Sequence, residues 1–203
     1  DHFAGKGTAA NDISTLVFEY LIRKGIPTHF VKRLSPTEEL VKKCEMIRLE
    51  FVTRNIVAGH FASRFGLKEG TPLAQPVEET FYKSDELDDP FANESDAIAI
   101  QACTAKEYQQ CWDLARRCNV LLTALFAKAG MKVVDFKLEF GKLADGTLVL
   151  ADEFSPDNCR LWDRETNAHL DKDVFRKGLA DITTTYDEVY ARLQKAVMEE
   201  NDD

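Results

Sequence analysis

The sequence predicts an α+β protein, because segments with helical and with strand periodicity are mixed along its 203 residues. The clearest strand lies at 134–140, where apolar and charged residues alternate. The clearest helix starts after Thr104, whose spacing to Glu107 matches a capping box, and its apolar stripe ends near Gly130. A hydrophobic content of 44% is enough for these elements to bury a core.

An amphipathic helix is expected near the start of the chain. Apolar residues fall on one helical face at 13–21, with Asn11 or Asp12 as the cap. Gly25 and Pro27 then end the helix, which we expect to cover a sheet.

Extended segments follow this helix. Two short ones are expected at 29–34 and 40–43, and a stronger strand at 46–54 shows alternating apolar and polar residues. The segment 66–95 is rich in Gly, Pro, Asp and Glu, so we expect a long irregular connection there.

Two further helices are expected near the end of the chain. Asp171 can cap a short helix through Leu179, and 182–198 has the pattern of a second amphipathic helix. The last five residues, 199–203, are almost wholly acidic, so we expect a frayed end.

The hairpin around Asp145-Gly146 carries the most informative chemistry. If these two residues form the loop, counting along the ladder places Glu139 directly opposite Asp152. Like charges in that position are destabilising unless a cation lies between them, and Mg²⁺ prefers carboxylate oxygens together with nucleotide phosphates. The pattern therefore suggests a metal-dependent ATP site, with a pair of solvated acidic side chains as the alternative.

Other charged residues surround this hairpin. Lys137 and Asp135 share the charged face of the strand with Glu139, so Lys137 could neutralise a substrate carboxylate or a phosphoryl group while Asp135 holds the lysine. After a turn at 155–157, Arg160 adds an anion-binding group at the same end.

Composition excludes several classes of protein. The net charge of -9 and the pI near 5.0 argue against general nucleic-acid binding. The five cysteines are odd in number and none forms a CxxC pair, which supports neither a disulfide framework nor a zinc site, so we expect reduced, mostly buried thiols. With no run of about 18 apolar residues and no signal-peptide pattern, the expected location is the cytoplasm.

Two motifs resemble a known family. The string VDFKLEFG at 134–141, followed by DEFSPDNCRLWD at 152–163, resembles the most diagnostic segment of the SAICAR synthetases, which are purine-pathway ligases. IRLEFVTRNIVAGH at 47–60 resembles their second motif. Further similarity, which extends the resemblance over nearly the whole chain, lies at 24–28, 40–43, 82–94 and 129–137.

The second motif also contains departures from the family pattern. Glu50, Arg54 and Gly59 match it. Arg48 stands where the family usually has proline, and His60 stands where it usually has serine.

The resemblance implies a fold with two lobes. Residues 1–53 would belong to an antiparallel-sheet nucleotide-binding lobe, and 54–203 to a larger α/β lobe that binds substrate and metal and includes the C-terminal helices. Family members begin with further strands and a loop over the ATP phosphates, which would precede Asp1; without them ATP would lose this cover.

The resemblance also implies an activity. The family joins L-aspartate to carboxyaminoimidazole ribonucleotide through an acyl phosphate, with ATP as co-substrate and Mg²⁺ as cofactor. No covalent protein nucleophile is needed, and we find no Ser/His/Asp or Cys/His arrangement in the sequence. The partners are then small molecules, with no nucleic acid and no membrane, and a homodimer is compatible with this assignment.

Roles follow for residues that match the family motifs. Glu139 and Asp152 would bind Mg²⁺ and the ATP phosphates, and Lys137 with Asp135 would act at the reacting groups. Glu50 would accept from the adenosine ribose or else pair with Arg48.

The nucleotide substrate would use other residues. Arg54 and Arg160 suit its 5′-phosphate or its carboxylate, with surface salt bridges as the alternative. His60 could donate to a phosphate or face solvent. Lys83, Asp85 and Asp89 lie in an acidic segment that could help form the aspartate pocket, although solvated acidic segments are common.

Two other functions stay open. A small-molecule kinase is the nearest rival, since inositol polyphosphate kinases have a related fold and carry Asp-x-Lys on a strand. The synthetase-like string at 155–163 and the lack of a basic surface argue against it.

The other alternative is a truncated, non-catalytic nucleotide-binding protein, suggested by Arg48, His60 and the phosphate loop that would precede the sequence.

Overall fold

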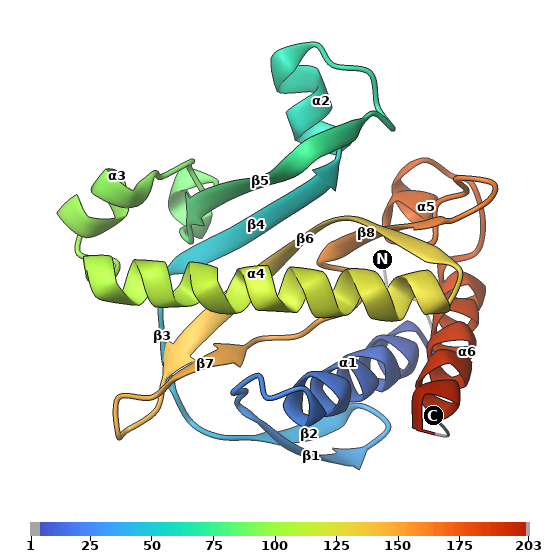
Figure 1. Ribbon diagram of the computed structural model, residues 1–203, viewed down its shortest axis with the longest axis horizontal. Helices are drawn as coiled ribbons and strands as arrows, with labels where there is room; N and C mark the ends of the chain where they lie inside the picture. The colour runs from blue at the N-terminus through green and yellow to red at the C-terminus, as the bar shows by residue number, and fades with distance from the viewer. Residues whose placement is uncertain (1–4, 202–203) are drawn as a thin grey trace.

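The computed structural model describes residues 5–201 as a six-stranded antiparallel sheet and a two-stranded sheet of β1 and β2, with helices packed around them (Figure 1), which confirms the predicted α+β class. The helices are α1 (Lys6–Arg23), α2 (Gly59–Phe65), α3 (Glu94–Ala99), α4 (Ala105–Lys128), α5 (Asp173–Arg176) and α6 (Ile182–Asn201), with a 3₁₀ turn at Asp85–Leu87. The strands are β1 (Phe30–Ser35), β2 (Glu38–Val41), β3 (Glu45–Met46), β4 (Leu49–Ile56), β5 (Pro72–Tyr82), β6 (Met131–Lys142), β7 (Leu148–Ala151) and β8 (Cys159–Asp163).

Strand β6 is the centre of the sheet. It pairs with β3, β4, β7 and β8, and β5 extends the sheet beyond β4. Phe136, Leu138 and Phe140 are buried in the main core. Because side chains alternate across a strand, the intervening Asp135, Lys137 and Glu139 lie on the opposite face. One strand therefore contributes both to the core and to a row of charged groups.

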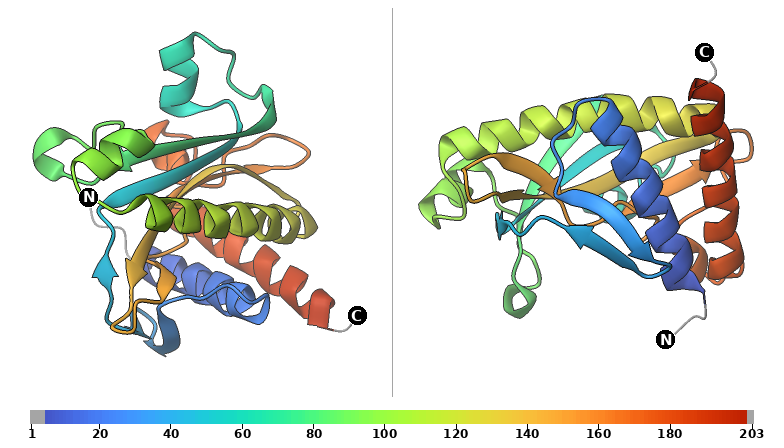
Figure 2. Two further views of the ribbon diagram at one scale, coloured as in Figure 1. Left: turned by 60° about the vertical axis from the view of Figure 1, so that its left-hand side comes forward. Right: turned by 90° about the horizontal axis from the view of Figure 1, so that it is seen from below.

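The long helix α4 crosses the sheet and packs against β4 and β6, while α1 and α6 lie side by side (Figure 2). The predicted capping box is confirmed at the start of α4. The Thr104 N–H donates to the Glu107 carboxylate at 2.8 Å, and the Glu107 N–H donates to the Thr104 hydroxyl at 3.2 Å. These bonds satisfy N–H groups that a helix terminus otherwise leaves without a partner.

The prediction of an irregular connection at 66–95 is wrong, since this segment contains the eleven-residue strand β5. Among the strands of the described residues β5 pairs with β4, and it lies at an edge of the sheet, where an isolated bridge joins Phe81 to Phe91. Edge strands tolerate proline and charged residues, which explains why the composition resembled that of a loop.

Other predicted boundaries also change. The strand expected at 46–54 is divided into β3 and β4, and α1 starts earlier than the apolar pattern indicated. The helix after Asp171 is a single turn, α5. At the C-terminus α6 continues to Asn201, so fraying at 199–201 is not observed, and residues 202–203 lie outside the described part of the chain.

The hairpin between β6 and β7 differs from the predicted two-residue loop. The Leu143 N–H donates to the Thr147 carbonyl at 2.9 Å, and Gly146 has a φ of +85°, which glycine adopts without strain. The loop thus contains residues 144–146, and Glu139 pairs with Ala151 instead of Asp152. Asp152 follows the end of β7.

The chain forms one main core, which contains residues from both sides of the predicted boundary between 53 and 54. This boundary falls inside β4, so the division into two lobes stays a prediction. Within residues 5–201, no helix combines the length and apolar character needed to cross a membrane. The cysteines are free thiols, and all except Cys44 are buried, as predicted.

Candidate functional site

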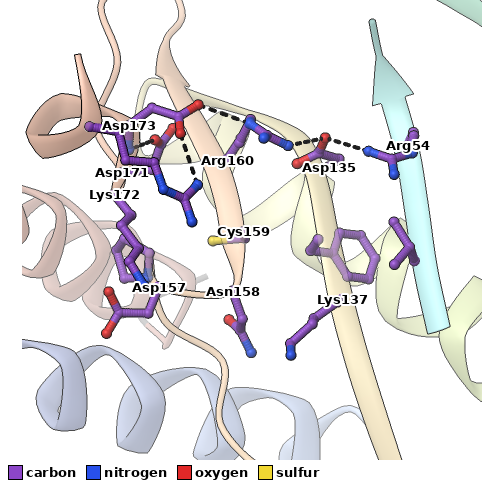
Figure 3. Close-up of a pocket in the computed structure, with 14 residues that line it drawn as sticks. Arg54, Asp135, Lys137, Asp157, Asn158, Cys159, Arg160, Asp171, Lys172 and Asp173 are labelled. Carbon is purple, nitrogen blue, oxygen red and sulfur yellow. Dashed lines mark hydrogen bonds and ion pairs between the residues drawn. The ribbon is translucent and has the colours of Figure 1, made fainter. Parts of the chain in front are cut away.

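A cavity of about 370 Å³ opens beside the charged face of β6 (Figure 3). Strands β4, β6 and β8 form part of its wall, and the segments 156–158 and 171–176 complete it. Three distant parts of the sequence therefore contribute to one hollow, among them both motifs singled out in the sequence.

At one end of the cavity, Arg54 and Arg160 converge on one carboxylate (Figure 3). The Arg160 Nη1 atom lies 2.8 Å from Asp135 Oδ2, and Arg54 Nη1 lies 3.2 Å from the same oxygen. Arg54 also donates through Nε to Glu79 at 2.7 Å, and Arg160 through Nε to Asp173 at 2.9 Å. The structure thus brings Arg54 and Arg160 together, and the identity of the ligand that they would bind stays a prediction.

The guanidinium groups at this end of the cavity keep unused N–H donors. Asp135 is only 4% exposed, and burial raises the pKa of its carboxyl group while the two guanidinium groups oppose that shift. Each arginine has five N–H donors, and the bonds above use two of them. Arg176, which bonds to Asp173 at 3.1 Å, adds a further guanidinium. Donors therefore remain for a planar or tetrahedral oxyanion.

Gly59 is required by the close approach of Arg160. A Cβ atom at Gly59 would lie 2.2 Å from Arg160 Nη2, and the residue has a φ of +54°. Any side chain here would displace the guanidinium and also strain the backbone.

At the other end of the same face lies a group of lysines and carboxylates. Lys83 Nζ is 2.7 Å from both carboxylate oxygens of Glu139. Lys137 bonds to Glu50 and lies 3.6 Å from Glu139 Oε1. Burial raises the pKa of Glu139; the Lys83 bond opposes this shift, and the charge of Asp152 adds to it. The prediction that Glu139 directly faces Asp152 is wrong, because Glu139 faces Ala151 and Asp152 is the next residue along the chain.

This arrangement corrects two predicted pairings. Asp135 does not hold Lys137, because Asp135 is bound by two arginines and Lys137 by Glu50. Glu50 does not pair with Arg48, whose guanidinium lies 5.0 Å from the centre of the Tyr82 ring. Burial lowers the pKa of Lys137, but its bond to Glu50 and the nearby acids outweigh this effect and raise it, so the ammonium form is favoured.

The remaining predicted residues lie apart from the cavity. Lys83 reaches Glu139, and Asp85 lines a second hollow of about 470 Å³ next to Lys83. Asp89 accepts a hydrogen bond from the Ser84 N–H within the same loop. His60 is exposed on α2 and does not line the cavity of Figure 3.

Sequence reasoning missed several residues at the site. Glu79 lies on a strand that was predicted to be a loop, and Asp173 was read only as part of a helix. The Asp-Lys-Asp sequence at 171–173 was the one available signal. With His169, Asp171 and Asp173 bring potential ligand atoms within 4.8 Å of one another, but Asp173 is already paired with two arginines and Asp171 accepts two backbone N–H groups.

The fold and this site together define a class of protein. A strand that carries a lysine between a guanidinium cluster and a pair of carboxylates is typical of enzymes that act on phosphorylated small molecules, since such sites must neutralise several negative charges at fixed positions.

Comparison with known proteins gives the family. A family profile described as SAICAR synthetase matches residues 1–193, and the chain belongs to the SAICAR synthetase family. It is 67% identical over 201 residues to the phosphoribosylaminoimidazole-succinocarboxamide synthase of Limosilactobacillus fermentum, covering 98% of this chain and 84% of the relative. The corresponding protein of Streptococcus pneumoniae is 50% identical over 195 residues, covering 96% and 83%.

Solved structures agree. The phosphoribosylaminoimidazole-succinocarboxamide synthase of Ehrlichia chaffeensis superposes with a TM-score of 0.93 at 44% identity, covering 96% of this chain and 83% of that one. A SAICAR synthetase in complex with ADP gives 0.92 at 42% identity, covering 95% and 82%. The resemblance identified from the motifs and the fold class predicted with it are confirmed.

Replacing Asp135 by Asn should destabilise the protein strongly, because Arg54 and Arg160 would lose their shared buried counter-charge. We expect a loss of roughly 3–5 kcal/mol in the free energy of unfolding, measured by urea denaturation. Asp113→Asn is the matched control: it removes a carboxylate whose side chain is 72% exposed and paired with Arg116, and should cost less than about 1 kcal/mol. Equal losses in the two variants would contradict this account.

Proposed function

We propose that this protein joins L-aspartate to carboxyaminoimidazole ribonucleotide at the expense of ATP, and that the charged face of β6 is where the reaction occurs. The relatives named as phosphoribosylaminoimidazole-succinocarboxamide synthases support the reaction. The observation that carries the site assignment is the position of Lys137 on β6, two residues from Asp135 at the arginine end and two from Glu139 at the acidic end.

The chemistry explains why such a site is needed. A carboxylate is a poor electrophile, because its charge repels nucleophiles and hydroxide leaves badly. A substrate carboxylate oxygen therefore attacks the γ-phosphorus of ATP, the bond to the bridging oxygen breaks, and ADP leaves. The aspartate amine then attacks the acyl carbon, phosphate leaves, and an amide forms after loss of a proton. The protein contributes positioning and charge neutralisation.

Arg54 and Arg160 would hold the 5′-phosphate or the carboxylate of the ribonucleotide. Their guanidinium groups are fixed by the shared Asp135, so little side-chain entropy would be lost when the anion binds. Lys137 would place its ammonium group between the substrate carboxylate and the transferring phosphoryl group, where both carry negative charge.

Glu139 and Asp152 fit a divalent cation. They offer hard carboxylate oxygens, and Asp152 directly follows Ala151, the residue that pairs with Glu139. Bound there, Mg²⁺ would neutralise charge on the ATP phosphates. Lys83, which pairs with Glu139, has a side chain that is 46% exposed and would leave this carboxylate to the cation.

The other assignments are less direct. Glu50 would accept from the adenosine ribose, beside its bond to Lys137. Lys83 and Asp85 would help bind L-aspartate at the second hollow. His60 would reach a phosphate only if its side chain turned from solvent. The nucleotide lobe at 1–53, the larger lobe at 54–203, a cytoplasmic location and a homodimer stay predictions of the same assignment.

A kinase acting on a small molecule is the alternative that a direct assay separates. ADP release from the purified protein should require both the imidazole carboxylate and L-aspartate for sustained turnover, because the acyl phosphate has no other productive acceptor. Coupled detection of ADP, with each substrate omitted in turn, measures this. Sustained release without aspartate would indicate a kinase, and no release with all substrates would contradict the ligase assignment.

Gly59→Ala should weaken binding of the ribonucleotide, because the added methyl group would displace the Arg160 guanidinium. Loss of a charged contact of this kind costs roughly 2–3 kcal/mol, or about 30- to 150-fold in Kd, measured by calorimetry with ATP absent. Gly66→Ala is the matched control, since Gly66 has a similar φ of +63° but no neighbouring atom within 4 Å of the added Cβ. If both variants lose affinity equally, backbone strain is responsible and the role of Arg160 is refuted.

A further inference from the structure

We propose that His29 is a positioning residue that holds the backbone of Asp152, which directly follows the Ala151 that pairs with Glu139, and so sets the direction of the Asp152 carboxylate. His29 directly precedes β1, lies outside the cavity of Figure 3, and has no role in the assignments above. The inference rests on the proposed function, because it concerns the two carboxylates assigned to the Mg²⁺ complex of ATP.

Asp152 has a strained backbone. It follows Ala151, the last residue of β7, and has a φ of +59°. A non-glycine residue in this left-handed region costs about 1–2 kcal/mol, so it persists only where its surroundings hold it. The Asp152 side chain is exposed and does not by itself fix the backbone. Aspartate adopts this region more readily than most residues, and a contact to its main chain would hold it there more firmly.

His29 supplies this contact. Its Nε2 atom lies 3.0 Å from the Asp152 carbonyl oxygen. A carbonyl oxygen only accepts, so Nε2 carries the hydrogen. The residue is 8% exposed, and its ring lies 5.5 Å from the ring of Phe18. Water has little access to this hydrogen bond and competes for it only weakly, so the bond is correspondingly stronger.

The histidine is itself tied to β7. The His29 N–H donates to the Leu150 carbonyl at 2.9 Å, and the Leu150 N–H donates to the Pro27 carbonyl at 2.9 Å. These two bonds set the segment 27–29 beside the strand whose end must be fixed. The imidazole therefore reaches the carbonyl oxygen of Asp152 from a defined position, because β7 and His29 are joined by these bonds.

Loss of the Nε2 hydrogen bond would free the Asp152 backbone to leave its positive φ, and this would change the direction in which its carboxylate projects. Residues that orient a metal ligand typically change metal affinity by roughly 10- to 100-fold when they are removed. We expect a change of this size for Asp152 when the His29 donor is absent.

Two substitutions separate positioning from packing. His29→Phe keeps a ring against Phe18 but has no donor, whereas His29→Gln keeps a donor at the place of Nε2 but has no ring. Binding of Mn²⁺ in the presence of ATP, measured by electron paramagnetic resonance, should weaken roughly 10- to 100-fold in His29→Phe and stay within about threefold of the natural protein in His29→Gln. Asp152→Asn gives the affinity expected when the ligand itself is lost.

If Mn²⁺ binding is unchanged in His29→Phe and weaker in His29→Gln, the positioning role is overturned and the metal assignment stays intact. If Asp152→Asn binds Mn²⁺ like the natural protein, the metal assignment fails and this inference fails with it. Should His29→Phe show no cooperative unfolding transition, His29→Asn replaces it, since its shorter amide cannot reach the carbonyl. His29→Asn must then bind Mn²⁺ more weakly than His29→Gln, and equal binding would refute the proposal.

Discussion

The structure depends on the two-residue period of β6, which has to serve the core and the site at once. Phe136, Leu138 and Phe140 occupy one set of alternating positions and are buried in the core. The positions between them carry the charged groups. A shift of one residue in the pairing of β6 with β4 would exchange the two sets, placing charges in the core and phenylalanines in the cavity. The register of this strand is thus fixed by the hydrophobic effect, and the spacing of the charged groups follows from it.

The candidate site gathers cations in a protein that is acidic overall. Its net charge is -9, yet cations collect locally because each is held by a carboxylate. Asp135 links two arginines, and Glu139 accepts from Lys83. Buried pairs of this kind gain little net stability, because desolvation offsets much of the attraction. Their value lies in orientation: an arginine already fixed by one carboxylate presents its remaining donors to a substrate with little further loss of entropy.

The sequence predicted the parts of this site that depend on short-range patterns. The alternation at 134–140 placed Asp135, Lys137 and Glu139 on one face, and the capping box located the start of α4. Sequence spacing alone could not show that Asp135 would be shared by Arg54 and Arg160, since that contact joins strands far apart in the chain. The exact register of the hairpin also failed, because a loop of residues 144–146 and one of two residues are both compatible with Asp145-Gly146. His29 gave no signal, since a histidine beside a strand is ordinary until its carbonyl partner is known.

The central claim is that Lys137 acts on the reacting groups, between separate sites for the ribonucleotide substrate and for ATP. Single-turnover ADP formation by Lys137→Met, with both Kd values measured on the same variant, tests it most directly. Loss of one charge-stabilising group should slow the chemical step roughly 100- to 1000-fold while each Kd stays within about threefold. Because the substitution leaves Glu50 without its partner, the double variant with Glu50→Gln controls for that unpaired charge and should be equally slow. A rate within tenfold of the natural protein, or restoration of the rate in the double variant, would contradict the account.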